Sequence, residues 1–220
     1  MKSWELVGRV DKQHDRSILW FVAKGEETRH AILARAFELA TVVGVSGLSI
    51  GRLAEATGLS KSGLFAHFGS KEALEVAVVE EASRQFVQAV MVPALREPRG
   101  VPRIRAMFEL WHTWGMRPGG CFFVGASSEL DDRPGAPRDA LVRAAKDWID
   151  ELTKAAQIAI REGHFRPDLD PAQFAFEEYG IMLGTHTFAR FLRERDAMTR
   201  SRQAFERLLQ SSLAPDYRPA

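Results

Sequence analysis

The chain has 220 residues, of which 45% are hydrophobic and 27% are charged, and its formal net charge is +1. This length and composition are typical of a folded globular protein and exclude a disordered, collagen-like or filamentous chain. No apolar run approaches the ~20 residues of a membrane helix, and the N-terminus lacks the form of a signal peptide, so we expect a cytoplasmic protein with no membrane partner.

Cysteine content and net charge exclude further kinds of site. The single cysteine, Cys121, excludes an internal disulfide framework and a zinc site made of several thiolates. Because the net charge is close to zero, any affinity for nucleic acid must come from a local basic surface. We expect neither a metal nor a cofactor.

Helical periodicity predicts the elements of the N-terminal part. Residues 1–25 show no sustained period, and we expect a partly disordered extension or a docked arm there. Apolar residues at helical spacing predict a helix over 26–43, which Gly44 ends. Three further helices are expected at 50–57, 61–68 and about 71–92.

The rest of the chain also has the pattern of helices separated by proline and glycine. Asp170 followed by Pro171 is typical of a helix start, and no segment shows the alternation of a strand. The sequence therefore predicts an all-α fold of about nine helices. The C-terminal segments are about 101–114, a short apolar piece at 121–130, and helices at about 138–162, 171–192 and 198–209.

Residues 49–69 have the pattern of a helix-turn-helix. Ala54 is small where two short helices would cross, Gly58 suits a left-handed turn, and Leu64 would fill the core beneath them. In this motif the second helix lies in the DNA major groove with its first residues at the base edges. Two ordinary short helices in a bundle are the alternative, because the Ala-x3-Gly spacing alone is a weak signal.

The longer segment from Ser49 to Glu72, SIGRLAEATGLSKSGLFAHFGSKE, is far more specific. It resembles the N-terminal DNA-binding domain of the TetR/AcrR family of bacterial transcriptional regulators, and the likeness covers about residues 26–75. The resemblance implies a DNA-binding domain at 26–72 and a ligand-binding and dimerisation domain at 73–212. An extension at 1–25 and a tail at 213–220 complete the expected organisation.

The resemblance also implies a set of DNA contacts. Lys61, Ser62 and Gly63 match positions that face the bases, and His67 and Lys71 match positions that bind phosphate. Where the family often has tyrosine this chain has phenylalanine, so a hydroxyl that usually meets a phosphate is missing. A solvated surface or packing across the turn is the alternative for several of these residues. The candidates are Thr28, Arg29, Ser49, Arg52, Lys61, Ser62, Gly63, Phe65, His67 and Lys71.

Aromatic residues are dense between positions 108 and 123 and recur on later helices. An apolar cavity with few polar groups is typical of small-molecule sites, although plain core is the better interpretation of any single residue. Only the resemblance favours a ligand site, and a redox role for Cys121 is a minor alternative because a lone buried thiol is usually inert. The candidates are Phe108, Trp111, His112, Trp114, Cys121, Phe122, Trp148, Phe176, Tyr179, Met182 and His186.

The segment 171–192 is apolar on more than one face, and Gly180 and Gly184 would allow another helix to approach closely. Such a helix must be covered on two sides. In the family the last two helices of each protomer form a four-helix dimer interface, so the resemblance implies a homodimer. The candidates for the interface are Phe174, Ile181, Gly184, Phe188, Leu192 and Phe205.

Catalysis has little support in the sequence. There is no Gly-x-Ser-x-Gly elbow, phosphate loop or dinucleotide motif, and the acidic cluster Glu129, Asp131 and Asp132 has no nearby histidine that would complete a metal site. We therefore expect a DNA-binding regulator rather than an enzyme. It would bind a palindromic operator as a repressor and leave it when a small hydrophobic ligand binds. An all-α enzyme and a ligand-independent DNA-binding protein are the alternatives.

Overall fold

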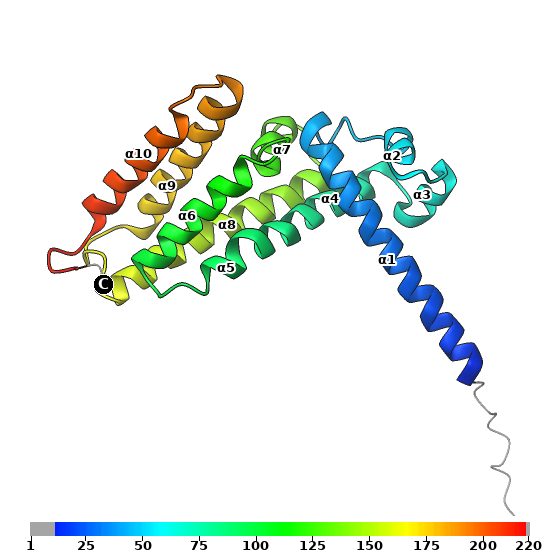
Figure 1. Ribbon diagram of the computed structural model, residues 1–220, viewed down its shortest axis with the longest axis horizontal. Coiled ribbons are helices and arrows are strands. Elements are labelled where there is room, and N and C mark those ends of the chain that lie inside the picture. The colour runs from blue at the N-terminus through cyan, green and yellow to red at the C-terminus, as the bar shows by residue number, and fades with distance from the viewer. Residues whose placement is uncertain (1–11, 219–220) are drawn as a thin grey trace, which may run out of the picture.

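The computed structural model describes the backbone of residues 12–218 and the side chains of residues 27–218. Within that part, every regular element is a helix, and the one extended pairing is an isolated bridge between Phe165 and Leu213. The described helices number nine when the π-helical turns and the short α5 are counted with the helices they continue. The all-α prediction is confirmed. Figure 1 shows α1–α3 gathered at one end of an elongated bundle.

The three-helix unit expected at the N-terminal end forms from α1 (Lys12–Val43), α2 (Ile50–Thr57) and α3 (Lys61–Phe68). Ser49 caps α2 by accepting a hydrogen bond from the backbone N of Arg52 at 3.2 Å, and Ser60 caps α3 through the backbone N of Gly63 at 3.1 Å. Between the two helices Gly58 has φ 69°, the left-handed conformation that glycine adopts without steric cost. We refer to residues 27–70 as the head.

Helix α1 begins earlier than the sequence analysis expected. It is continuous from Lys12, so residues 12–25 extend the first helix and are neither disordered nor a docked arm. Figure 1 shows this part projecting away from the rest of the molecule. No proline falls between Lys12 and Val43, so the backbone has no residue that would break the helix at position 25. The prediction for residues 1–11 lies outside the described residues.

The remaining helices form the body of the molecule, in which α8 packs against α4 and α9, and α10 packs against α9. The segment 121–130, expected only as a short apolar piece, is a regular helix. The expected long helix at 171–192 ends in a π-helical turn, whereas the one at 71–92 passes through such a turn and continues into a short α-helical segment. The body comprises α4 (Lys71–Phe86), η1 (Val87–Met91), α5 (Val92–Ala94), α6 (Val101–Gly115), α7 (Phe122–Leu130), α8 (Ala136–Arg161), α9 (Pro171–His186), η2 (Thr187–Phe191) and α10 (Ala197–Ser212).

Burial strongly shifts the pKa values of two polar side chains inside the body. His112 lies 2.9 Å from the hydroxyl of Ser201, and burial lowers its pKa to about 4, so the ring is neutral near pH 7. Glu178 on α9 is 1% exposed, and neither carboxyl oxygen has a hydrogen-bond partner among the described residues. Burial raises the pKa of Glu178 to about 8, so this carboxyl holds its proton near pH 7.

Replacing Glu178 with glutamine should therefore remove one component of the pH dependence of stability. The folded-state pKa lies above the unfolded value of 4.5, so the wild-type protein should lose stability as pH rises from about 4.5 to about 8. Between pH 6.5 and 8, the free energy of unfolding of the wild type should fall by about 2 kcal/mol relative to that of Glu178→Gln. The measurement is urea unfolding of both proteins at equal concentration. Equal pH slopes for both proteins would contradict the buried-acid assignment.

Candidate DNA-binding surface and ligand cavity

Helix α3 divides cleanly into a core face and an outer face. Leu64 and Phe68, one helical turn apart, are buried, whereas Lys61, Ser62 and Phe65 are exposed. The ring of Phe65 is 54% exposed, an unusual position for a large apolar side chain. The outer face of α3 therefore presents one cation, one hydroxyl and one aromatic ring, which is a composition suited to base edges and thymine methyl groups.

The other side chains predicted to contact DNA differ in how exposed they are and in whether they have partners within the protein. Arg52 is exposed at the start of α2, and Ser49 is exposed but uses its hydroxyl as the helix cap. Arg29 of α1 lies over the ring of Phe68 at 5.6 Å, and its neighbour Thr28 is half-exposed. His67 is half-buried beside Phe68, and Gly63 is half-buried at the Ser60 cap.

Lys71 has partners within the protein itself. Its Nζ donates a hydrogen bond to the backbone oxygen of Ser46 at 2.8 Å and lies 3.6 Å from the carboxylate of Glu75. The ammonium group thus holds the loop between α1 and α2. A phosphate contact by Lys71 stays a prediction, and it would have to share the ammonium group with these two oxygens.

Removing the charge of Lys61 should weaken DNA binding mainly through the electrostatic part of the affinity. Lys61→Ala should fold normally, bind DNA more weakly, and reduce the slope of log affinity against log salt by about one unit. Lys146→Ala, which removes an exposed charge from α8 in the body, is the matched control. Fluorescence anisotropy across a salt series measures both slopes. A slope for Lys61→Ala equal to that of the control would contradict the contact.

The body contains a cavity of about 360 Å³ between α4, α7 and α8, closed on one side by residues of α6 and α9. Its wall is mainly aromatic and aliphatic, and the charged residues Glu80, Arg143 and Asp147 are exposed at its edge. Both serine hydroxyls in the wall already donate to backbone oxygens of their own helices, Ser83 to Val79 and Ser127 to Val124. The cavity thus offers an apolar interior with few free hydrogen-bond donors.

Four of the residues predicted for a ligand site line this cavity, and the sequence analysis missed several others. The four are Trp111, Cys121, Trp148 and Tyr179. The missed residues lie on α4, η1, α7 and α8. On α8 the small side chains of Ala140, Ala144 and Ala145 leave room for the cavity. That alanine-rich stretch of α8 was the available sequence signal. The missed wall residues include Val79, Phe86, Val87, Met91, Phe123, Val124 and Leu141.

The other predicted ligand residues lie elsewhere and need correction. Phe176 is 72% exposed on the outside of α9, so it cannot face the cavity. Phe108 and Met182 are fully buried in solid core, and His112 pairs with Ser201. The ring of Trp114 lies beneath the guanidinium of Arg117 at 3.6 Å. Phe108, His112, Trp114 and Met182 are buried within the body, and neither they nor Phe176 line the cavity.

Phe122 and His186 border a second, smaller cavity of about 210 Å³ where the end of α1 meets α7. Cys121 borders both cavities and is 2% exposed. Burial raises the pKa of the Cys121 thiol, which keeps it protonated and weakens it as a nucleophile. The structure therefore offers no support for the minor redox alternative.

The outer side of α9 and η2 carries a row of exposed apolar side chains that we call the α9 face. It consists of Phe176, Phe188, Phe191 and Leu192, which are 50% to 82% exposed. Gly180 and Gly184 have open space where a side chain would project, so another helix could approach them closely. Ile181, predicted for an interface, is half-buried on the same helix. Phe191 was missed by the sequence analysis.

Two predicted interface residues belong instead to the interior of the protomer. Phe174 is 1% exposed and its ring lies 5.0 Å from that of Phe165. Phe205 is 3% exposed and stacks on Phe108 with ring centroids 3.7 Å apart. Both are already covered by their own chain and are removed from the predicted interface.

Metal-binding groups and membrane-spanning helices are both absent from the described residues. No group of three or more histidine, cysteine or acidic side chains there could hold a metal ion. None of the described helices is long and apolar enough to cross a membrane.

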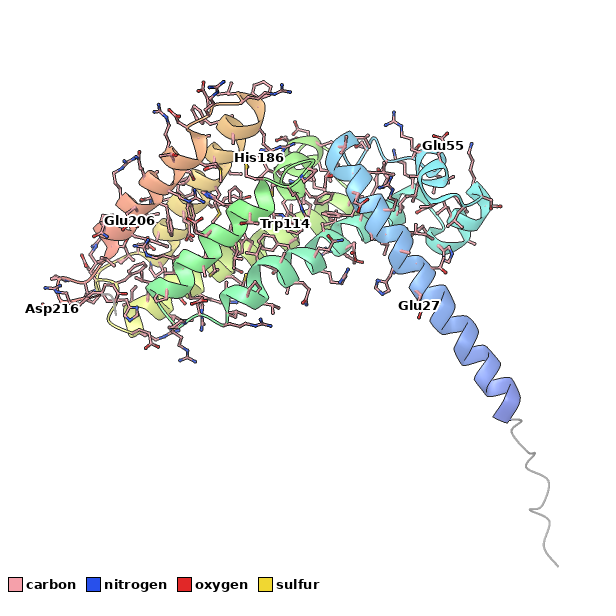
Figure 2. All side chains as sticks on the ribbon, viewed as in Figure 1. Glu27, Glu55, Trp114, His186, Glu206 and Asp216 are labelled. Carbon is pink, nitrogen blue, oxygen red and sulfur yellow. The ribbon has the colours of Figure 1, made fainter. Side chains whose placement is uncertain are left out.

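The geometry defines a class of protein before any comparison is made. A helix-turn-helix head with an exposed second helix is joined through α4 to a helical body that contains an apolar cavity. Figure 2 shows the two parts, with Glu55 in the head and Trp114 in the middle of the body. This is the architecture of a helix-turn-helix transcriptional regulator with a separate sensing domain.

Family models identify the particular family. A model described as "Bacterial regulatory proteins, tetR family" matches residues 32–78, and one described as "Tetracyclin repressor-like, C-terminal domain" matches residues 100–205. The chain belongs to the TetR family of transcriptional regulators. A search of curated protein sequences found no significant match.

Several solved structures share this fold over most of their length. A TetR transcriptional regulator from Chloroflexus aurantiacus is 29% identical, with a TM-score of 0.77 over 87% of this chain and all of that one. Reduced NemR from E. coli is 23% identical, with a TM-score of 0.75 over 87% of this chain and 100% of its own. AibR, whose structure contains isovaleryl coenzyme A and operator DNA, is 24% identical, with a TM-score of 0.64 over 84% of this chain and 98% of its own. At their identity, NemR and AibR show the fold alone.

Proposed function

We propose that this TetR-family regulator represses transcription by binding a palindromic operator as a homodimer, and that a small apolar ligand in the cavity of the body releases it. The observation that carries the proposal is that one chain contains both an exposed recognition helix in the head and an apolar cavity in the body, and that α4 continues the chain directly from the head into the cavity wall. In this proposal the protein acts on DNA in the cytoplasm and is not an enzyme.

DNA binding is supported by the outer face of α3 and the start of α2. Lys61 and Arg52 are exposed cations on adjacent helices of the head, and Phe65 is exposed one helical turn after Lys61. Cations there would bind phosphate or guanine, and the ring would contact a thymine methyl group or a sugar. We propose that the predicted contacts act together, with α3 in the major groove and α2 over the backbone.

Dimerisation is supported by the α9 face. Exposed phenylalanines on one side of a helix are costly in water unless another surface covers them. Because a twofold dimer uses the same surface on both partners, pairing two α9 faces would cover both and would place two heads on one duplex. A palindromic operator follows from that symmetry.

Ligand binding is supported by the cavity in the body. Its volume of about 360 Å³ is within the range of small-molecule sites, and its aromatic wall favours an apolar ligand. A ligand can alter DNA affinity only by binding one conformation better than another, and a tenfold effect needs a preference of only about 1.4 kcal/mol.

Selection of DNA from a random duplex library tests the core of this proposal. The purified protein should enrich a palindrome, and nuclease footprinting should show protection of both half-sites. Recovery of no sequence above background, under low-salt conditions where DNA-binding proteins bind tightly, would contradict the regulator assignment.

The dimer is tested by adding bulk to the α9 face. Gly184→Leu should hold two paired helices apart and weaken the dimer, because the open space beside this glycine would be filled. Ala31→Leu adds apolar bulk to an exposed position of α1 in the head, outside the α9 face, and serves as the control. Sedimentation at micromolar concentration should show a dimer for the wild type and the control. A monomeric wild type would refute this interface.

A further inference from the structure

The loop between α1 and α2, residues 44–49, is held by a side chain from the body. The carboxylate of Glu129, near the end of α7, accepts hydrogen bonds from the backbone N of Val45 at 2.8 Å and from the backbone N of Ser46 at 2.5 Å. Lys71 donates to the backbone oxygen of Ser46 at 2.8 Å. One loop of the head is thus bound by a carboxylate and an ammonium group from two helices of the body.

The two hydrogen bonds to Glu129 are stronger than hydrogen bonds between neutral groups. A carboxylate that accepts from two successive backbone N–H groups makes charge-assisted bonds, and the site is partly shielded from water. Gly44 permits the close approach, since it has φ 80° and a side chain there would meet the Glu129 carboxylate at 2.8 Å. The contact is therefore specific in geometry as well as in charge.

The loop that Glu129 holds determines where α2 begins. Val45 and Leu48 within the loop are 1% and 0% exposed, so they anchor it in the core of the head. Ser49, the next residue, caps α2. A shift of the loop relative to the body would therefore shift α2, and α3 with it, as one packed unit.

Helix α7 connects this contact to the cavity. Phe123, Val124 and Ser127 line the cavity, and Glu129 follows within the same nine-residue helix. At the other end of α7, Phe122 packs on Phe37 of α1 with ring centroids 5.6 Å apart. A helix this short moves as a rigid body, so displacement of its cavity side also displaces both of its contacts with the head.

We propose that Glu129 is a positioning residue that sets the orientation of the head relative to the body, and that it links occupancy of the cavity to operator binding. The inference rests on the proposed function. It assigns a role to a carboxylate that the sequence analysis considered only as part of an acidic cluster. Glu129 touches neither DNA nor ligand in this role and acts through the loop at 44–49.

The test measures how strictly each protein discriminates the spacing between half-sites. The probes are the palindrome that the wild-type protein selects and the same duplex with one base pair added or removed at its centre. A positioned pair of heads should favour the selected spacing by ~10-fold or more, because half-sites must match the separation of the heads. Glu129→Ala should reduce this preference to ~3-fold or less, since freed heads adapt to each spacing.

Two variants separate positioning from a general loss of stability. Glu129→Gln keeps one acceptor oxygen but turns an NH₂ group toward a backbone donor, so its preference should be intermediate. Asp132→Asn changes an exposed acid just beyond α7 and should behave as wild type. A merely structural role would lower the affinity for all three duplexes by one common factor and leave the spacing preference unchanged, which would overturn the proposal.

Hydrogen exchange gives a second measurement that needs no DNA. The amide protons of Val45 and Ser46 should exchange faster in Glu129→Ala than in the wild type, while those in the core of α8 should be unchanged. Equal protection of the loop in both proteins would also overturn the proposal. If the wild type selects no palindrome but the loop amides respond, the proposed function fails while the positioning contact stands.

Discussion

The junction between head and body depends on a cluster of aromatic rings around one arginine. Phe37 of α1 lies 6.1 Å from Trp114 of α6, and Trp114 meets Phe86 of α4 edge to face at 5.5 Å. The guanidinium of Arg117 lies over the rings of Trp114 and Phe37 at 3.6 and 5.2 Å. Aromatic and cation–π contacts of this kind contribute about 1 kcal/mol each. They join α1, α4 and α6 into one unit.

The same rings separate solid core from cavity. Phe86 contacts Trp148 edge to face at 4.9 Å and also lines the cavity, so one side of this ring is packed and the other is open. On the far side of α6, Phe108 and Phe205 stack tightly and leave no space. Ligand-induced change would therefore begin on the side of α4, α7 and α8, which is also the side that contacts the head.

Polar groups within the body restrict how its helices can slide. The His112–Ser201 pair joins α6 to α10, and Arg202 of α10 binds Glu109 of α6 at 2.8 Å. These contacts tie α6 to α10 beneath the α9 face. By contrast, few polar contacts cross the wall of the cavity, where α7 and α8 meet through alanine and aromatic side chains. Under the proposed function, the side held by these polar contacts would keep its shape in the dimer, while the cavity side, with fewer of them, would rearrange around a ligand.

The sequence by itself determined the helical fold and the helix-turn-helix, because the interactions that define them are local. Ser49 and Ser60 each accept a hydrogen bond from the backbone N three residues further along, and Gly58 adopts the left-handed conformation of the turn. The burial of Leu64 and Phe68 follows from their helical spacing. Only the tertiary structure decided that Phe86 and Phe123 line the cavity while Phe176 faces outward and Phe205 is buried. It also brought Glu129 to Val45 across 84 positions of the chain. Periodicity reveals that a helix has an apolar face, but the partner of that face is set by contacts between helices distant in sequence.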